Sequence, residues 1–320
     1  MFPNPLPGVP AIESPFFDAI FSQAGFSEET LRVATQLRDH GFAVIDFPEP
    51  DFDRLAGDIR RDLNDRFDWD RWRTQGHAEG DGLRLQDAFG YSEGVRRVAT
   101  NPDIIRLLSQ LFGRRAWPFQ TLNFPVGTQQ HIHTDAIHFS SVPERFMCGV
   151  WTALEDVDLA AGPLLYYPGS HRWPIYTNEH IGLSAEQQGG HQYRHYETLW
   201  RGLAERSGIA PQRFTPRKGQ ALIWLSNLLH GGDRQTDRSL TRWSQVTHYY
   251  FEDCAYYTPL LSDPFLRNVH FREMQNICTG RFVRNTYAGA EMPQRIVRPQ
   301  WLDRWTRRAK SVARSLSGRG

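Results

Sequence analysis

KGQALIWLSNLLHGGDRQTDRSLTRWSQVTHYYF, residues 218–251, is the stretch that decides the fold. It holds two runs rich in apolar, β-branched and aromatic residues, ALIWL at 221–225 and TRWSQVTHYYF at 241–251. A polar segment with two glycines separates them. Runs of this composition, separated by turn residues, are typical of consecutive β-strands. The stretch therefore predicts a β-rich core in this part of the chain.

Similar runs lie upstream of this stretch, separated by Gly, Pro and Asp turns. They are WPFQTLNF (117–124), HIHTDAIHF (131–139), MCGVWTAL (147–154) and LLYYPG (164–169). The earlier part of the chain instead has helical spacing, in segments 27–40, 51–66 and 92–112, with one strand-like run at 41–47. Ser27 is expected to cap the first helix, and Gly113 to end the last. Helices first and strands later predict helices packed on one β core, not βαβ units.

An HxD triplet in one of these runs is the first sign of a metal site. In a strand, residues i and i+2 share a face, so His133 and Asp135 are expected to project together. His230, which precedes the two glycines of the 218–251 stretch, is the candidate third ligand. Two imidazoles and one carboxylate leave positions open on a metal, the arrangement of non-haem iron(II) oxygenases.

Other histidines offer alternative interpretations. HxD alone is a weak signal, because a single strand histidine is more often a hydrogen-bonded structural residue than a ligand. His131 shares the expected face of His133 and is a ligand candidate in a shifted register. His138 is expected beside the ligands or the substrate, and His248 is expected to pack inside the core.

A second constellation follows the third candidate ligand. Arg242 and Ser244 stand at i and i+2 in an expected strand, so they share a face. A guanidinium fork beside a hydroxyl is a good receptor for a terminal carboxylate. A dicarboxylate such as 2-oxoglutarate has the shape to chelate iron at one end and reach this pair at the other. Arg238 is the rival anchor, but its polar surroundings favour a turn.

At this point the sequence resembles the phytanoyl-CoA dioxygenase family of 2-oxoglutarate oxygenases. The resemblance rests on HTD at 133–135, WTALEDVDLAAGPLLYYPGSHR at 151–172, and the 218–251 stretch, in that order. It implies a mainly β protein with flanking helices, whose core is a double-stranded β-helix, a cupin-like jelly roll. It also implies Fe(II), 2-oxoglutarate and O2 as reactants, and hydroxylation of a C–H bond of a small-molecule metabolite with release of succinate and CO2.

The resemblance also implies roles for individual residues. Carried over by position, the catalytic iron ligands are His133, Asp135 and His230. Binding of 2-oxoglutarate then falls to Arg242 and Ser244, with Gln120 and Asn123 near positions that often contact it. Halogenating relatives have Gly or Ala at the carboxylate position. Asp135 there favours hydroxylation or a related oxidation.

A single oxygenase domain is expected over residues 1–320. It divides into a mostly helical part (1–115), the jelly-roll core (116–255) and a C-terminal extension with a basic tail (256–320). Within the core, the long polar segment 172–216 is predicted to be either a lid insertion or a surface excursion with a small helix.

Composition narrows the remaining possibilities. The formal net charge of +1 gives no global field toward nucleic acid or membrane. No leader peptide and no run of 18 apolar residues is evident, and the three cysteines show no metal-binding spacing. We therefore expect a cytoplasmic protein with a small-molecule substrate and no nucleic-acid or membrane partner. The sequence does not predict an oligomeric state or the substrate.

Two rival functions stay open at this stage. A cupin-like metal-dependent isomerase or lyase would need the three ligands but not Arg242. A non-catalytic metal-binding domain would keep only the fold.

Overall fold

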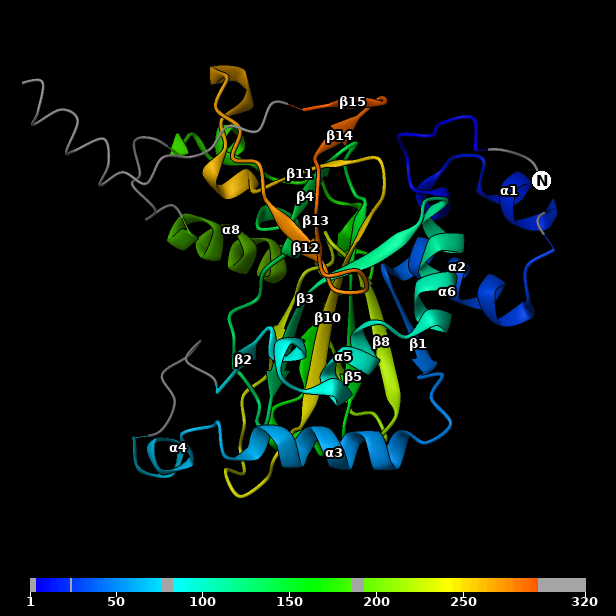
Figure 1. The fold of residues 1–320 in the computed structure, drawn as a ribbon. Helices are drawn as coiled ribbons and strands as arrows, with labels where there is room; N and C mark the ends of the chain where they lie inside the picture. Colours follow the sequence, from blue (N-terminus) through cyan, green and yellow to red (C-terminus); the bar gives the residue numbers. More distant parts are fainter. Residues whose placement is uncertain (1–3, 24, 76–82, 186–192, 293–320) are drawn as a thin grey trace, which may run out of the picture.

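A six-stranded antiparallel sheet forms the larger wall of the core in the computed structural model, which describes residues 4–23, 25–75, 83–185 and 193–292 (Figure 1). The strand order is β1–β8–β5–β10–β3–β2. The strands are β1 (Phe42–Asp46), β2 (Leu85–Gln86), β3 (Ala116–Phe124), β5 (Met147–Ala153), β8 (Gln220–Leu225) and β10 (Ser244–Phe251). Strands β8 and β10 are the two runs of the 218–251 stretch, and β5 lies between them.

A three-stranded sheet, β7–β6–β9, forms the opposing wall. Its strands are β6 (Leu164–Tyr166), β7 (Gln212–Phe214) and β9 (His230–Gly232). Smaller pairs extend the fold, namely β4 (Ser140–Val142) with β11 (Ala255–Tyr257), β12 (Met274–Asn276) with β13 (Arg281–Val283), and β14 (Thr286–Tyr287) with β15 (Ala290–Glu291). One pocket is lined by residues of both walls, as expected for a jelly roll, and the predicted double-stranded β-helix core is confirmed.

The two faces of β10 have different roles. Val246 and His248 point into the pocket between the sheets. The alternate residues point the other way: Gln245 donates to the carbonyl oxygen of Val95 at 3.0 Å and Tyr249 to that of Ala99 at 2.8 Å. Because side chains alternate along a strand, one face of the sheet binds a helix while the other forms the pocket.

Helices pack against the outside of the larger sheet and its edges (Figure 1). They are α1 (Phe17–Gln23), α2 (Glu28–His40), α3 (Phe52–Asn64), α4 (Trp69–Gln75), α5 (Glu93–Ala99) and α6 (Pro102–Phe112). Helix α8 (Tyr193–Arg206) lies apart from them (Figure 1), and its Trp200 packs with Tyr167 and Leu229 beside the smaller sheet. The predicted caps are present. The Ser27 side chain accepts from the Thr30 backbone N–H at 3.1 Å, and Gly113 ends α6 with φ +75°.

Short 3-10 turns connect several of these elements. They are η1 (Ala11–Glu13), η2 (Ala88–Gly90), η3 (Asp135–Ile137), η4 (Leu159–Ala161), η5 (Ser170–Arg172), η6 (Asn178–Ile181), η7 (Pro259–Leu261) and η8 (Pro264–Leu266).

Two sequence predictions are wrong in detail. The helical segment 92–112 is two helices, because the Asn101 side chain caps a new helix, with Pro102 at its start. The segment 131–139 is not a strand. Only His133 forms a β-bridge, and Asp135 begins η3. The close approach of the two side chains therefore does not come from strand alternation.

Segment 172–216 contains η6, α8 and β7, and residues 186–192 of it lie outside the described part. The basic tail falls within residues 293–320 and also lies outside the described residues. Among the described residues, no helix is long and apolar enough to cross a membrane.

Candidate metal centre

The pocket between the two sheets has a volume of about 410 Å³, within the range usual for small-molecule sites. The larger sheet contributes side chains from β3, β5, β8 and β10, and the smaller sheet contributes β6 and β9. All three predicted ligands line it: His133, Asp135 and His230. Their ligand atoms lie within 4.8 Å of one another, and all three residues are buried. The structure thus brings the predicted triad together.

Backbone pairing sets the two histidines opposite each other. His133 N–H donates to the His230 carbonyl oxygen at 2.7 Å, and His230 N–H donates back to the His133 oxygen at 2.9 Å. This isolated antiparallel bridge places the two ring centroids 4.5 Å apart. Asp135 follows two residues later, where the chain turns into η3. An isolated bridge followed by a turn therefore brings the side chains of His133 and Asp135 together, which a regular strand was expected to do.

Each histidine is oriented by its own loop. The Nδ1 atom of His133 lies 2.8 Å from the His131 carbonyl oxygen, and the Nδ1 of His230 lies 2.9 Å from that of Leu228. A carbonyl can only accept, so Nδ1 carries the proton in both rings. Each Nε2 is then left with a lone pair, and these atoms lie 3.8 and 4.0 Å from Asp135 Oδ1. Both rings thus direct Nε2 toward the site, as metal-binding histidines do.

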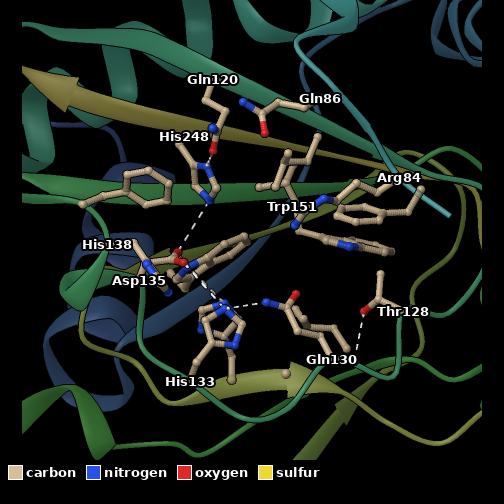
Figure 2. A pocket seen from close by; sticks show the side chains of 18 of the residues that line it. Arg84, Gln86, Gln120, Thr128, Gln130, His133, Asp135, His138, Trp151 and His248 are labelled. Carbon is tan, nitrogen blue, oxygen red and sulfur yellow. Dashed lines mark hydrogen bonds and ion pairs between the residues drawn. The ribbon is translucent and has the colours of Figure 1, made fainter. Parts of the chain in front are cut away.

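The two carboxylate oxygens of Asp135 have different partners (Figure 2). Oδ1 faces the two histidines, whereas Oδ2 accepts a 2.8 Å hydrogen bond from Trp224 Nε1–H. The Nε2 of His248 lies 3.6 Å from the same Oδ2. Trp224 and His248 therefore hold the carboxylate so that one oxygen remains available to a metal. The sequence analysis missed Trp224, which stands in an otherwise aliphatic strand.

Two glycines allow this arrangement. Gly149 on β5 is paired in register with Trp224 on β8, and a Cβ at position 149 would lie 2.2 Å from the indole Cζ2. Gly231, directly after the ligand His230, lies so close to the 128–132 segment that a Cβ would be 2.8 Å from the Gln130 carbonyl oxygen. The glycines thus permit close approach of the tryptophan and of the loop that bears the other two ligands.

Burial and neighbouring charges set the protonation of the triad. Burial, with His230 beside it, lowers the pKa of His133 to about 3, so its ring is neutral at physiological pH. Burial alone would raise the pKa of Asp135, but His230, His248 and His133 together hold it below its ordinary value. Two imidazoles and one carboxylate are a donor set that fits Fe(II).

Arg242 also lines the pocket and is almost fully buried. One terminal nitrogen donates to the Gly162 carbonyl oxygen at 2.8 Å, and the guanidinium lies 5.7 Å from the ring centre of Trp151. Among the described residues it has no acidic partner, and its buried Nε–H has no hydrogen-bond partner. Burial lowers the pKa of Arg242 to about 10, which leaves it a cation at neutral pH. A buried, unpaired cation in a ligand pocket fits an anionic ligand.

The other predicted contacts of 2-oxoglutarate divide into two groups. Gln120 lines the pocket and its Oε1 lies 3.0 Å from Nδ1 of His248. Ser244 is buried on the same side of β10 as Val246 but is not among the residues that line the pocket, and its hydroxyl has no partner among the described residues. Asn123 is not brought to the pocket. Its amide nitrogen donates to Gln245 Oε1 at 3.2 Å, on the face of the sheet that packs on α5.

The remaining histidines are also placed. His138 and His248 line the pocket, so His248 does more than the packing predicted for it. His131 does not line the pocket, and its carbonyl oxygen orients His133.

The fold and the site together define a class: a jelly-roll protein with a two-histidine, one-carboxylate metal site. Within that class, the sequence model described as "Phytanoyl-CoA dioxygenase (PhyH)" matches residues 37–240. The chain therefore belongs to the phytanoyl-CoA dioxygenase family.

Known proteins agree with this assignment. The chain is 24% identical over 192 residues to "Phytanoyl-CoA dioxygenase, peroxisomal" of Rattus norvegicus, covering 57% of this chain and 54% of the relative. It thus spans about half the length of the curated relatives that it matches.

Two solved structures share the fold. The "non-heme alpha ketoglutarate dependent carbocyclase SnoK" has a TM-score of 0.56 at 14% identity, covering 82% of this chain and 95% of that one. The "epimerase SnoN in complex with Fe3+, alpha ketoglutarate and nogalamycin RO" has a TM-score of 0.51 at 19% identity, covering 83% and 96%.

Proposed function

We propose that this protein is an Fe(II)- and 2-oxoglutarate-dependent dioxygenase that hydroxylates an unactivated C–H bond of a small-molecule metabolite, with release of succinate and CO2. The observation that carries the proposal is the buried Arg242, which has no acidic partner in the described part of the chain and lies in the same pocket as the ligand triad. A metal site alone is compatible with many reactions. A metal site beside a receptor for a distant carboxylate fits a chelating 2-oxo acid with a second carboxylate.

The proposed roles follow from the contacts. His133, Asp135 and His230 would hold Fe(II), and Arg242 would bind the far carboxylate of 2-oxoglutarate, with the Ser244 hydroxyl beside it. When bound, Fe(II) and 2-oxoglutarate supply the activation of O2 for oxidation of a substrate C–H bond. Trp224 and His248 hold the Asp135 carboxylate in position, and Trp151 and Phe124 exclude water from the wall of the pocket.

The rival functions are less well supported. A cupin-like isomerase or lyase gives no reason for the unpaired cation at Arg242, and a non-catalytic metal-binding domain gives none for the 410 Å³ pocket. The solved relatives also point to 2-oxoglutarate, since the names of SnoK and SnoN include alpha ketoglutarate.

The names of these two relatives describe a carbocyclase and an epimerase, so the chemical outcome needs its own test. Asp135 at the carboxylate position supports hydroxylation over halogenation. Incorporation of one 18O atom from 18O2 into the product would identify hydroxylation and exclude epimerisation and ring closure.

Removing the carboxylate ligand tests the function. Asp135→Ala is expected to abolish Fe(II)-dependent formation of succinate from 2-oxoglutarate, because two neutral imidazoles hold Fe(II) poorly. Succinate would be measured by mass spectrometry, with iron content determined on the same samples. Asp156→Ala, at an exposed position outside the pocket, is the matched control. Full succinate formation by Asp135→Ala would contradict the assignment.

Further proposals concern the whole chain. We propose a single domain over residues 1–320 and a cytoplasmic location, which the three free cysteines support. We also propose that 172–216 covers the pocket mouth. Trp200 of α8, in this segment, lies 6.3 Å from the His133 ring, between ring centres. Nucleic acid and membrane are not among the proposed partners.

A further inference from the structure

The charges around the pocket do not balance. Among the described lining residues the cations are Arg84, Arg242 and Arg272, and the only acidic residue is Asp135. Under the proposed function, Fe(II) and Arg242 together carry as much positive charge as Asp135 and 2-oxoglutarate carry negative charge. Among the described residues, neither Arg84 nor Arg272 has an acidic partner. Arg84 is exposed to solvent, whereas the Nε of Arg272 is buried. A partly buried cation without a partner is costly unless a ligand neutralises it, and this applies to Arg272.

Arg272 is the better fixed of the two. It lies between η8 and β12, outside the region 37–240 that matches the family. Its backbone N–H donates to the Tyr256 carbonyl oxygen at 2.8 Å, and one terminal nitrogen donates to Thr258 Oγ1 at 2.9 Å. The guanidinium lies 4.7 Å from the ring centre of Phe139. Its Nε–H is buried and has no partner among the described residues. The side chain is thus held in place with hydrogen-bonding capacity to spare.

Arg272 is also close to the metal ligands. The ring of Phe139, on which its guanidinium rests, lies 5.1 Å from the ring of His248 between centroids. His248 in turn lies 3.6 Å from Asp135 Oδ2. The terminal nitrogen of Arg272 also approaches the carbonyl oxygen of His138 at 3.4 Å, three residues after the ligand Asp135. Arg272 and the three ligands therefore line the same pocket, where one small molecule can contact both.

We infer that Arg272 is the substrate-anchoring residue and that the substrate is a small organic anion, whose carboxylate or phosphate oxygens Arg272 binds. Arg84, which is exposed at the pocket rim, attracts the same anion during entry. This inference rests on the proposed function and names its substrate class. A planar guanidinium offers two parallel donors to an oxyanion, so it fixes the orientation of the substrate as well as its position. The C–H bond to be oxidised would then be directed toward the triad.

The alternative is that Arg272 has a purely structural role, and the experiment must distinguish this role from substrate binding. Its bond to the His138 carbonyl oxygen ties the C-terminal extension to the core, and its bond to Thr258 lies within that extension. The loss of Arg272 is therefore expected to lower stability in either case. A residue with only a structural role would not make the pocket bind an anion in preference to a neutral molecule of the same shape.

The test uses the full chain loaded anaerobically with Fe(II) and 2-oxoglutarate, with benzoate and benzamide as probes of matched shape and different charge. Binding is measured by calorimetry. Benzoate is expected to bind wild-type protein at least about tenfold more tightly than benzamide. Arg272→Gln is expected to weaken benzoate binding by about ten- to a hundredfold, leaving 2-oxoglutarate binding unchanged. Arg281→Gln, at an exposed arginine of the same extension, is expected to change neither.

A second variant shows whether a loss of binding in Arg272→Gln comes from impaired folding. Arg272→Lys keeps the charge but not the fork, so it is expected to retain preference for benzoate over benzamide at reduced affinity. Equal binding of the two probes by wild type, no binding of benzoate, or unchanged benzoate affinity in folded Arg272→Gln would overturn the inference. Failure of the Fe(II)-loaded protein to bind 2-oxoglutarate would instead overturn the proposed function, and this inference with it.

Discussion

Asp135 shows at the scale of one residue how the site works, because its two oxygens have separate partners. Oδ1 faces the histidines, and Oδ2 is held by Trp224 and lies near His248. The ligand triad could be predicted from sequence, since the ligand types, their order and the downstream arginine form one pattern. Trp224 could not, because its bond to Asp135 arises from the pairing of β8 with β5, which no local pattern encodes.

Trp224→Phe tests the role of this hydrogen bond. The ring is retained but the Nε1–H donor to Asp135 is lost, so Fe(II) affinity is expected to fall by about ten- to a hundredfold. Anaerobic Fe(II) titration measures the dissociation constant. Trp117→Phe is the control, because this buried indole donates to the Tyr256 hydroxyl and does not line the pocket. Equal Fe(II) affinity in Trp224→Phe and wild type would show that the bond does not position the ligand.

At the scale of elements, strand alternation separates correct from incorrect predictions. Gln120 and Asn123 are three apart on β3, so they face opposite sides, and only Gln120 lines the pocket. The period of two could therefore have excluded one of the pair. The irregular segment around His133 was beyond prediction, because its shape depends on a bridge to His230, 97 residues later in the printed sequence.

Gly149→Ala tests the packing of two central strands. The added methyl would overlap the Trp224 indole, so the variant is expected to lose about 1–3 kcal/mol of unfolding free energy and to bind Fe(II) more weakly. Urea denaturation and Fe(II) titration measure the two effects. Gly202→Ala on α8 is the matched control. Its methyl would meet only the flexible end of Arg206, and alanine is expected to stabilise the helix by about 0.5–1 kcal/mol. If Gly149→Ala loses stability but binds Fe(II) as tightly as wild type, the contact between Gly149 and Trp224 does not position the metal site.

At the scale of the whole molecule, the N-terminal part and the β core are joined more closely than the sequence indicated. Strand β1, from the mostly helical part, pairs with β8 in the larger sheet. His171 adds a second connection, since its Nε2 lies 3.1 Å from the Arg38 carbonyl oxygen of α2 and its own carbonyl accepts from Asn227. Composition could predict helices and a β core, but not that one edge strand of the core comes from the helical part.

His171 also predicts a pH dependence of stability. Burial lowers its pKa to about 4, against about 6.5 in the unfolded chain, so protonation favours unfolding as pH falls from 6.5 toward 4. Between pH 7 and pH 5 this residue is expected to cost about 2 kcal/mol of unfolding free energy. His171→Gln cannot be protonated, so its stability should fall less over the same interval. Urea denaturation of both proteins at the two pH values measures the difference. Parallel pH profiles for the two would contradict the prediction.

The central claim is that the triad and Arg242 together bind 2-oxoglutarate, and its affinity for the anaerobic Fe(II)-loaded protein tests this most directly. Arg242→Gln is expected to raise the dissociation constant by about ten- to a hundredfold, because a charged hydrogen-bonding partner of the far carboxylate is lost. Arg238→Gln, at the exposed rival position, is expected to bind 2-oxoglutarate as wild type does. No binding of 2-oxoglutarate to wild type, or equal affinity in Arg242→Gln and wild type, would contradict the claim.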